Sequence, residues 1–208
     1  MKERLMDILK DTSPGGLWRL SSELNALKAR AALRRDKKSA QIEDAVDAAL
    51  STARDFHEFS VEMLSEISSK DFSQMASLFD LTSIGALALQ DVFPRKEGFS
   101  LPKILLGALS EGLIFLGSRQ YVAGATRIVN ARLRIHSHKV YERLWELPLN
   151  YKKQFSEEDV VELQRSLDEF FKEFLREDVS PYPKVAVLQQ FYSLILVLQI
   201  ERVIRTMR

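Results

Sequence analysis

Apolar residues recur every three or four positions along most of the chain, which is the spacing of one buried helix face. The spacing is most regular over residues 41–68, where the opposite face is rich in Asp and Glu. No stretch alternates at period two for long enough to form a half-buried strand. The pattern predicts helices over residues 2–10, 17–35, 41–68, 70–80, 81–92, 103–147 (divided at Gly117), 157–176 and 184–207. We therefore expect an all-α fold: a single helical bundle of about six to eight helices with one long central helix.

Capping and helix-breaking residues set the expected helix ends. Ser39 is placed to cap the helix over 41–68, and Ser100-Leu101-Pro102 has a proline in the first turn of a helix. Pro148 should end the helix before it, because the residue before a proline avoids the helical region. Ser156 with Asp159 has the spacing of a capping box. Four glycines between residues 107 and 124 should permit close helix–helix contact: Gly107, Gly112, Gly117 and Gly124.

The length of 208 residues suits one domain with a substantial core. We expect residues 1–208 to form a single all-α domain. Within it, residues 1–38 would be an N-terminal helical appendage with a basic end, and residues 39–208 the core of the bundle.

Composition narrows the chemistry. The chain has no cysteine and three histidines, which excludes cysteine-rich zinc sites and disulfides. His57 belongs to neither an HExxH nor a Glu-x-x-His pair, and no phosphate-binding loop or GxSxG elbow occurs. We therefore predict no metal and no cofactor.

The most apolar stretch, residues 185–200, is short for a membrane span and contains three glutamines. A buried core helix is the better interpretation, so we predict no membrane span. The N-terminal residues alternate charged and apolar groups and do not resemble a secretory signal. The expected location is the cytoplasm.

Charge is unevenly distributed although the net charge is only +1. Residues 112–141 contain no Asp or Glu, and a second basic cluster lies between residues 28 and 38. These basic groups either pair with the acidic helices over 41–68 and 157–178 or form a docking surface. On a helical wheel, four basic residues of the first stretch fall within the apolar arc, namely Arg132, His136, Lys139 and Arg143. Those outside the arc are Arg119, Arg127, Arg134 and His138.

If the basic groups form a docking surface, they would bind nucleic acid or another anion. The candidate residues for this role are Arg119, Arg127, Arg134, Lys139, Arg34, Arg35, Lys37 and Lys38.

Two family resemblances involve the same stretch. Arg132 and His138, which have five residues between them, resemble the Arg-x4–6-His motif of HEPN-domain ribonucleases. That resemblance implies a dimer cleft that cuts RNA without a metal, with His138 as general base, Arg132 stabilising phosphate charge and Tyr141 nearby. Leu133 departs from the polar residue that is usual in that family.

The second resemblance covers residues 119–175. An Arg-rich helix (NARLRIHSHKVYERL), a linker and a helix capped by Ser-Glu-Glu look like the α-domain of GINS replication subunits. That family is non-catalytic and works by assembly. The first hundred residues do not match its LP-x-x-[FY] opening, and no small β-domain follows.

The predicted function is a non-enzymatic helical interaction or scaffold subunit of a nucleic-acid-handling complex. Its partners would be copies or relatives of itself in a homo- or hetero-oligomer, together with nucleic acid. One alternative is a metal-independent ribonuclease using Arg132, His138 and Tyr141. The other is a structural, coat-like helical protein that assembles.

Overall fold

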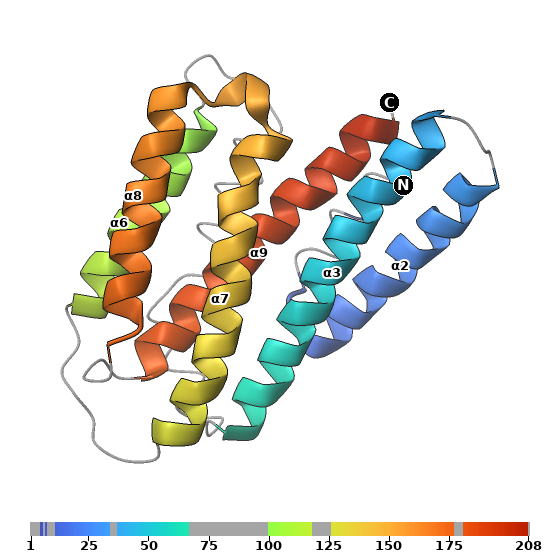
Figure 1. Cartoon of the computed structure of the whole chain (residues 1–208). Helices are drawn as coiled ribbons and strands as arrows, with labels where there is room; N and C mark the ends of the chain where they lie inside the picture. The colour runs from blue at the N-terminus through green and yellow to red at the C-terminus, as the bar shows by residue number, and fades with distance from the viewer. Residues whose placement is uncertain are drawn as a thin grey trace. The chain divides into compact units, whose positions relative to one another are not determined.

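A computed structural model of the chain describes residues 11–33, 37–66, 100–117, 126–176 and 181–207, together with Leu5 and Asp7. These ranges contain α-helices and no β-strand (Figure 1), which confirms the all-α prediction. The helices are α2 (Pro14–Ala32), α3 (Lys37–Glu66), α6 (Leu101–Gly117), α7 (Thr126–Asn150), α8 (Glu157–Phe174) and α9 (Pro181–Met207), with the short 3-10 helix η1 (Lys152–Gln154) before α8. The helices expected over 70–80 and 81–92, and most of 2–10, lie outside the described residues.

The chain divides into two compact units. The terminal unit combines Met1–Ile67 with Gln189–Arg208, and the middle unit is Ser68–Leu188. Helix α9 is continuous and contributes its first residues to the middle unit and the rest to the terminal unit. That residues 1–208 form a single domain stays a prediction.

In the terminal unit, α2 and α3 lie side by side (Figure 1). Leu20, Leu24 and Leu27 form the buried face of α2, at the spacing that the sequence predicts. One lysine of the basic end pairs with the acidic face of α3, because Lys28 Nζ lies 2.6 Å from Asp47 Oδ1. Part of the charge separation seen in the sequence is thus neutralised within this unit.

The same unit has an aromatic core. The rings of Phe56 and Tyr192 stack with centroids 5.3 Å apart, and the ring of Phe59 lies 5.5 Å from that of Tyr192. Along α9 the side chains are buried on nearly all sides, as predicted. Among the described residues, Pro183–Met207 is the one segment long and apolar enough to cross a membrane, and 78% of its most apolar window is buried.

In the middle unit, α6 and α8 pack together at a glycine. A Cβ at Gly112 would stand only 2.7 Å from Cε2 of the Phe170 ring, so the absence of a side chain permits this contact. The prediction of close contact is confirmed at Gly112. It is wrong at Gly107, where a Cβ would have nothing within 4 Å among the residues that the structure describes. For Gly117 and Gly124 it stays a prediction.

Helix ends agree with the sequence in part. Helix α8 begins with the predicted capping box: Ser156 Oγ accepts from the Asp159 N–H, and Asp159 Oδ2 accepts from the Ser156 N–H at 2.9 Å. The cap at Ser39 is wrong, since α3 begins two residues earlier and Ser39 is buried within its first turn.

The predicted stop at Pro148 is also wrong. Helix α7 continues to Asn150, and the Tyr151 N–H still donates to the Leu147 carbonyl at 3.0 Å. A proline this close to a helix end removes few hydrogen bonds. Leu147 and Tyr151 are buried and keep the last turn against the core.

Candidate interaction surface

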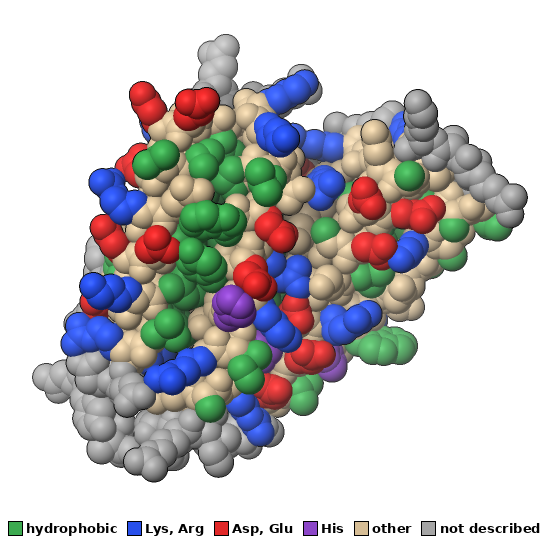
Figure 2. All heavy atoms as spheres, viewed as in Figure 1, with side chains coloured by type: hydrophobic (Ala, Val, Ile, Leu, Met, Phe, Trp, Pro, Cys, Tyr) green, Lys and Arg blue, Asp and Glu red, His purple; other side chains and the backbone are tan. Residues whose placement is uncertain are grey.

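Exposed apolar side chains of α7 and α8 in the middle unit include Trp145, Leu149, Val161 and Leu175, besides Ile135 nearer the start of α7. We call the first four the α7–α8 strip. Leu149 and Val161 are the most exposed, at 64% and 66%. Hydrophobic side chains gather over these two helices in Figure 2. Single exposed apolar residues are normal, whereas a contiguous group is typical of an interaction site.

The two helices are antiparallel because only six residues, 151–156, join them. The Tyr141 hydroxyl donates to Asp168 Oδ1 at 2.8 Å and fixes the level at which the helices face each other. Eight residues further along α7 and seven back along α8, Leu149 and Val161 therefore lie at similar heights. Leu175 lies at the other end, so the strip is about 20 Å long at 1.5 Å per residue.

Aromatic rings form the floor of the strip. The ring of Tyr141 stacks on Trp145 with centroids 5.8 Å apart and meets Phe171 edge-on at 5.4 Å. Phe171 in turn packs edge-on against the buried Phe170 at 5.0 Å. Such pairs add to the free energy of apolar burial. The strip therefore lies on a packed layer of rings that fixes the positions of its side chains.

Tyr141 is the titratable group of this layer. Burial raises the pKa of its hydroxyl, and the hydrogen bond to the Asp168 carboxylate raises it further. The hydroxyl keeps its proton because the anion would lose solvation and would face a negative partner. The group acts as a neutral donor that holds α7 to α8.

Charges border the strip on both sides. Glu142 and Glu146 on α7 are exposed, and Arg165 and Lys172 on α8 are exposed. Each pair extends the outward face of its own helix beyond the apolar residues. The α7 edge of the strip carries two carboxylates, whereas the α8 edge carries both signs of charge, because Glu158, Glu162 and Glu169 are also exposed on α8.

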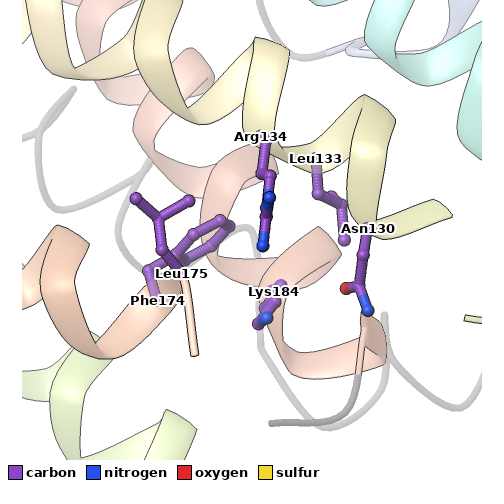
Figure 3. Close-up of a pocket in the computed structure, with 6 residues that line it drawn as sticks. All are labelled: Asn130, Leu133, Arg134, Phe174, Leu175 and Lys184. Carbon is purple, nitrogen blue, oxygen red and sulfur yellow. The ribbon is translucent and has the colours of Figure 1, made fainter. Parts of the chain in front are cut away.

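A small cavity lies at the end of α8 (Figure 3). It is lined by α7, the end of α8 and the start of α9, through Asn130, Leu133, Arg134, Phe174, Leu175 and Lys184. Its volume of about 10 Å³ is enough for one water molecule and far too small for an organic cofactor. The Asn130 Oδ1 atom is buried and has no hydrogen-bond partner within the described part of the chain. A water molecule would satisfy it.

Lys184 explains how α8 ends beside this cavity. Its ammonium group donates to the Arg176 carbonyl at 2.6 Å and lies 5.7 Å from the centre of the Phe174 ring. Carbonyls at a helix C-terminus lack helical donors and carry partial negative charge, so a cation stabilises them. Lys184 is 3% exposed, so this is a structural contact rather than an open anion site.

The residues predicted to bind anions are only partly described. Arg134 and Lys38 are exposed, and Lys139 is half-buried. The side chains of Arg119, Arg127, Arg34, Arg35 and Lys37 lie outside the described parts. The helical wheel correctly places His136 inside and Arg134 and His138 outside. Ile135, an apolar residue of the same helix, is nevertheless 60% exposed.

The three residues of the ribonuclease alternative are not brought together on one face. His138 lies six positions after Arg132, which places the two side chains about 120° apart around α7. His138 is exposed and its Nε2 lies 3.2 Å from Glu142 Oε1, one turn away. The Tyr141 hydroxyl donates a hydrogen bond to the Asp168 carboxylate. Within one chain, each of these groups has a different environment.

Sequence reasoning missed the strip itself. Trp145 and Leu149 carry a signal, because they continue the spacing of Tyr141 by fours outside the apolar arc of the helix. Val161 stands one position after the apolar stripe of α8 and gives a weaker signal. The sequence also gave Lys184 no role, although it is the one cation among apolar residues at the start of α9.

Among the described residues, no three His, Asp or Glu side chains are grouped as metal ligands would be. No family model, no curated protein and no solved structure matches the chain, so the candidate surface is judged on its own geometry.

Proposed function

We propose that the protein is a non-enzymatic helical interaction subunit that binds a protein partner through the α7–α8 strip. One observation carries the proposal: Trp145, Leu149, Val161 and Leu175 are exposed together on two adjacent helices. Burying such side chains against a partner removes apolar area from water, at roughly 25 cal/mol per Å².

The layer below the strip supports the proposal. Tyr and Trp are the residues most enriched at the energetic centres of protein interfaces. Here Tyr141 and Trp145 stack, and the hydrogen bond to Asp168 holds the tyrosine in place. A surface whose side chains are already fixed loses less conformational entropy on binding than a mobile one.

Association with nucleic acid stays a prediction from the sequence. The ribonuclease and the coat-like alternatives also stay predictions from the sequence.

Site-specific photocrosslinking tests the proposal. p-Benzoylphenylalanine would replace Leu149 or Val161 in the full chain, in cells of the organism that encodes it. The matched controls carry the same residue at Leu33, the C-cap of α2, or at Val61 on α3, which are also exposed. We expect a discrete protein adduct from the two strip positions and none from the controls. Absence of any adduct at Leu149 and Val161 would reject the strip as a binding surface.

A further inference from the structure

The outward face of α8 carries a row of charges whose signs alternate in a particular order. The members follow one another at spacings of three and four residues, and the five within the helix lie within about 80° of its circumference. Acidic and basic side chains interleave over α8 in Figure 2. All six members are exposed: Glu158, Glu162, Arg165, Glu169 and Lys172, and then Arg176 two residues past the helix end. We call these six the α8 charge row.

Most of these charges have no counter-charge within the chain. Among the described residues, the five members within α8 form no ion pair, although side chains at these spacings on one helix are near enough to pair. Arg176 is different, because its Nη1 lies 2.9 Å from Glu173 Oε2. The charges within the helix are therefore available to a partner.

We infer that the α8 charge row binds a second copy of this chain, with the two α8 helices antiparallel across a twofold axis at the level of Leu167. The inference rests on the proposed function and names its partner. Twofold dimers are the commonest assemblies, and each uses one patch twice. In this dimer, positions that lie equally far before and after residue 167 face each other.

Every charge of the row meets an opposite charge in this arrangement. Glu162 faces Lys172 of the partner subunit, and Arg165 faces Glu169 of the partner subunit. The two end members of the row, one acidic and one basic, face each other in the same way. Each contact occurs twice by symmetry. Opposite charges that meet across an interface favour correct pairing.

Other arrangements of two α8 helices bring like charges together. A twofold axis parallel to the helices would place each member of the row against its own copy. Sliding the antiparallel helices by seven residues would bring Glu158 against Glu169 of the partner subunit, or Arg165 against Arg176 of the partner subunit. Like charges in a desolvated contact oppose association. The order of the signs thus selects one orientation and one register.

Two apolar residues of the α7–α8 strip flank the charges. Val161 and Leu175 lie seven positions before and after Asp168, so they share the side of α8 on which Asp168 accepts from Tyr141 of α7. The twofold axis runs across the helices and keeps α7 of both copies on that same side. Val161 therefore lies within about 3 Å of the height of Leu175 of the partner subunit. The two side chains exclude water beside the ion pairs.

The carboxylates of α7 fit the same dimer. The hydrogen bond between the two helices fixes their relative heights. Glu146 then lies within about 1.5 Å of the height of Lys172 of the partner subunit. Glu142 lies at the level of the axis, between the Arg165 side chain of its own copy and Arg165 of the partner subunit. Its Oε1 atom already lies 3.2 Å from His138 Nε2. Both carboxylates thus have basic groups of the partner beside them.

Sedimentation equilibrium of the full chain over a wide concentration range tests the dimer. We expect a reversible monomer–dimer equilibrium. Val161→Ser should weaken it roughly tenfold or more, because the partner covers this side chain. Val61→Ser, on α3, is the matched control and should leave it unchanged. Both positions are exposed, so circular dichroism should show an intact helical fold.

Charge reversal tests the orientation and the register. Arg165→Glu alone and Glu169→Arg alone should each weaken the homodimer roughly tenfold or more, because each puts two like-charge contacts in the interface. An equimolar mixture of the two variants should form a heterodimer about as readily as the unaltered protein forms its dimer, since both contacts again join opposite charges. Mixing Arg165→Glu with Glu162→Arg is the control. It should not restore association, because these two positions do not face each other.

The outcomes separate the two proposals. A chain that stays monomeric, yet forms adducts with another protein at Val161, overturns the second copy and leaves the interaction surface standing. A monomer without any adduct overturns both. A dimer that Val161→Ser and Arg165→Glu leave unchanged overturns this interface. A dimer that both variants weaken, but that mixing does not restore, overturns the antiparallel register.

Discussion

At the scale of single residues, the sharpest contrast is between two glycines of α6. Gly112 has the Phe170 ring where a side chain would be, and Gly107 has open space. Spacing along the sequence treats them alike, since they lie five residues apart in one helix. Only the path of α8 tells them apart, and that path depends on tertiary packing.

This contrast gives a paired prediction. Gly107→Ala should raise the free energy of unfolding by about 0.5–1 kcal/mol, because alanine favours the helix. Gly112→Ala gains the same propensity but pushes the fully buried Phe170 ring, at a cost of about 1–3 kcal/mol. It should be neutral or destabilising. Urea unfolding of both variants measures the difference, and equal stabilisation would show that α6 and α8 are not in contact at Gly112.

A second residue-scale prediction concerns Tyr141. Its absorbance change on ionisation should occur above the ordinary pKa of 10.0. The raised pKa means that its contribution to stability is fully present below that value and is lost as the pH rises through the folded pKa. Asp168→Asn should lower the pKa of Tyr141, because a negative neighbour becomes neutral. Glu169→Gln, next on α8 and exposed, should have no effect.

At the scale of elements, the sequence predicted most helices, and its errors have physical causes. The capping box at Ser156 is a local signal, so four residues were enough to find the start of α8. Pro148 was misjudged because the buried Leu147 and Tyr151 keep α7 helical past a signal that operates locally. Ser39 was misjudged because it is itself buried within the first turn of α3. The strip was missed because the exposure of Trp145 and Val161 depends on how each helix is rotated about its own axis in the folded protein.

The capping box can be tested as a unit. Ser156→Ala should lower the free energy of unfolding by about 0.5–2 kcal/mol, because the Asp159 N–H loses its acceptor. Ser110→Ala, at an exposed position within α6, should not destabilise the protein. Chemical unfolding at neutral pH compares them. Equal effects of the two changes would mean that the cap does not contribute.

The same cap predicts a pH dependence. The Ser156 N–H and then its hydroxyl hold the pKa of Asp159 below its ordinary value of 3.8. A lowered folded pKa means stability that is fully present above 3.8 and lost as the pH falls through the folded value. Removing the serine hydroxyl should raise the pKa of Asp159, and NMR titration of the carboxyl carbon would detect it. An unchanged titration would contradict the contribution of the hydroxyl.

Lys184 allows a test of how α8 ends. Lys184→Met keeps a long apolar stem but removes the donor to the Arg176 carbonyl. Losing this part-buried hydrogen bond from a charged donor should cost about 1.5–3 kcal/mol. Lys172→Met, exposed on the last turn of α8, is the matched control. Thermal unfolding with no difference between the two would show that this contact is dispensable.

At the scale of the whole molecule, binding of nucleic acid by the basic residues stays a prediction. A net charge of +1 gives no overall attraction to nucleic acid. The predicted contribution of Arg134 can be measured as the salt dependence of binding to a labelled duplex. If Arg134 contacts a phosphate, Arg134→Ala should reduce the slope of log K against log salt by about 0.9, and Arg165→Ala should not. No binding at low salt would end the nucleic-acid prediction.

Helix α9 belongs partly to each unit, which limits how this protein can be divided into fragments. The boundary after Leu188 falls inside a helix, where there is no linker to cut. A chain truncated there would lose Tyr192 and leave the rings of Phe56 and Phe59 without cover. Because the terminal unit combines residues 1–67 with residues 189–208, no single excised fragment of the middle of the chain contains it. Deletion series should therefore keep residues 1–67 and 189–208 together.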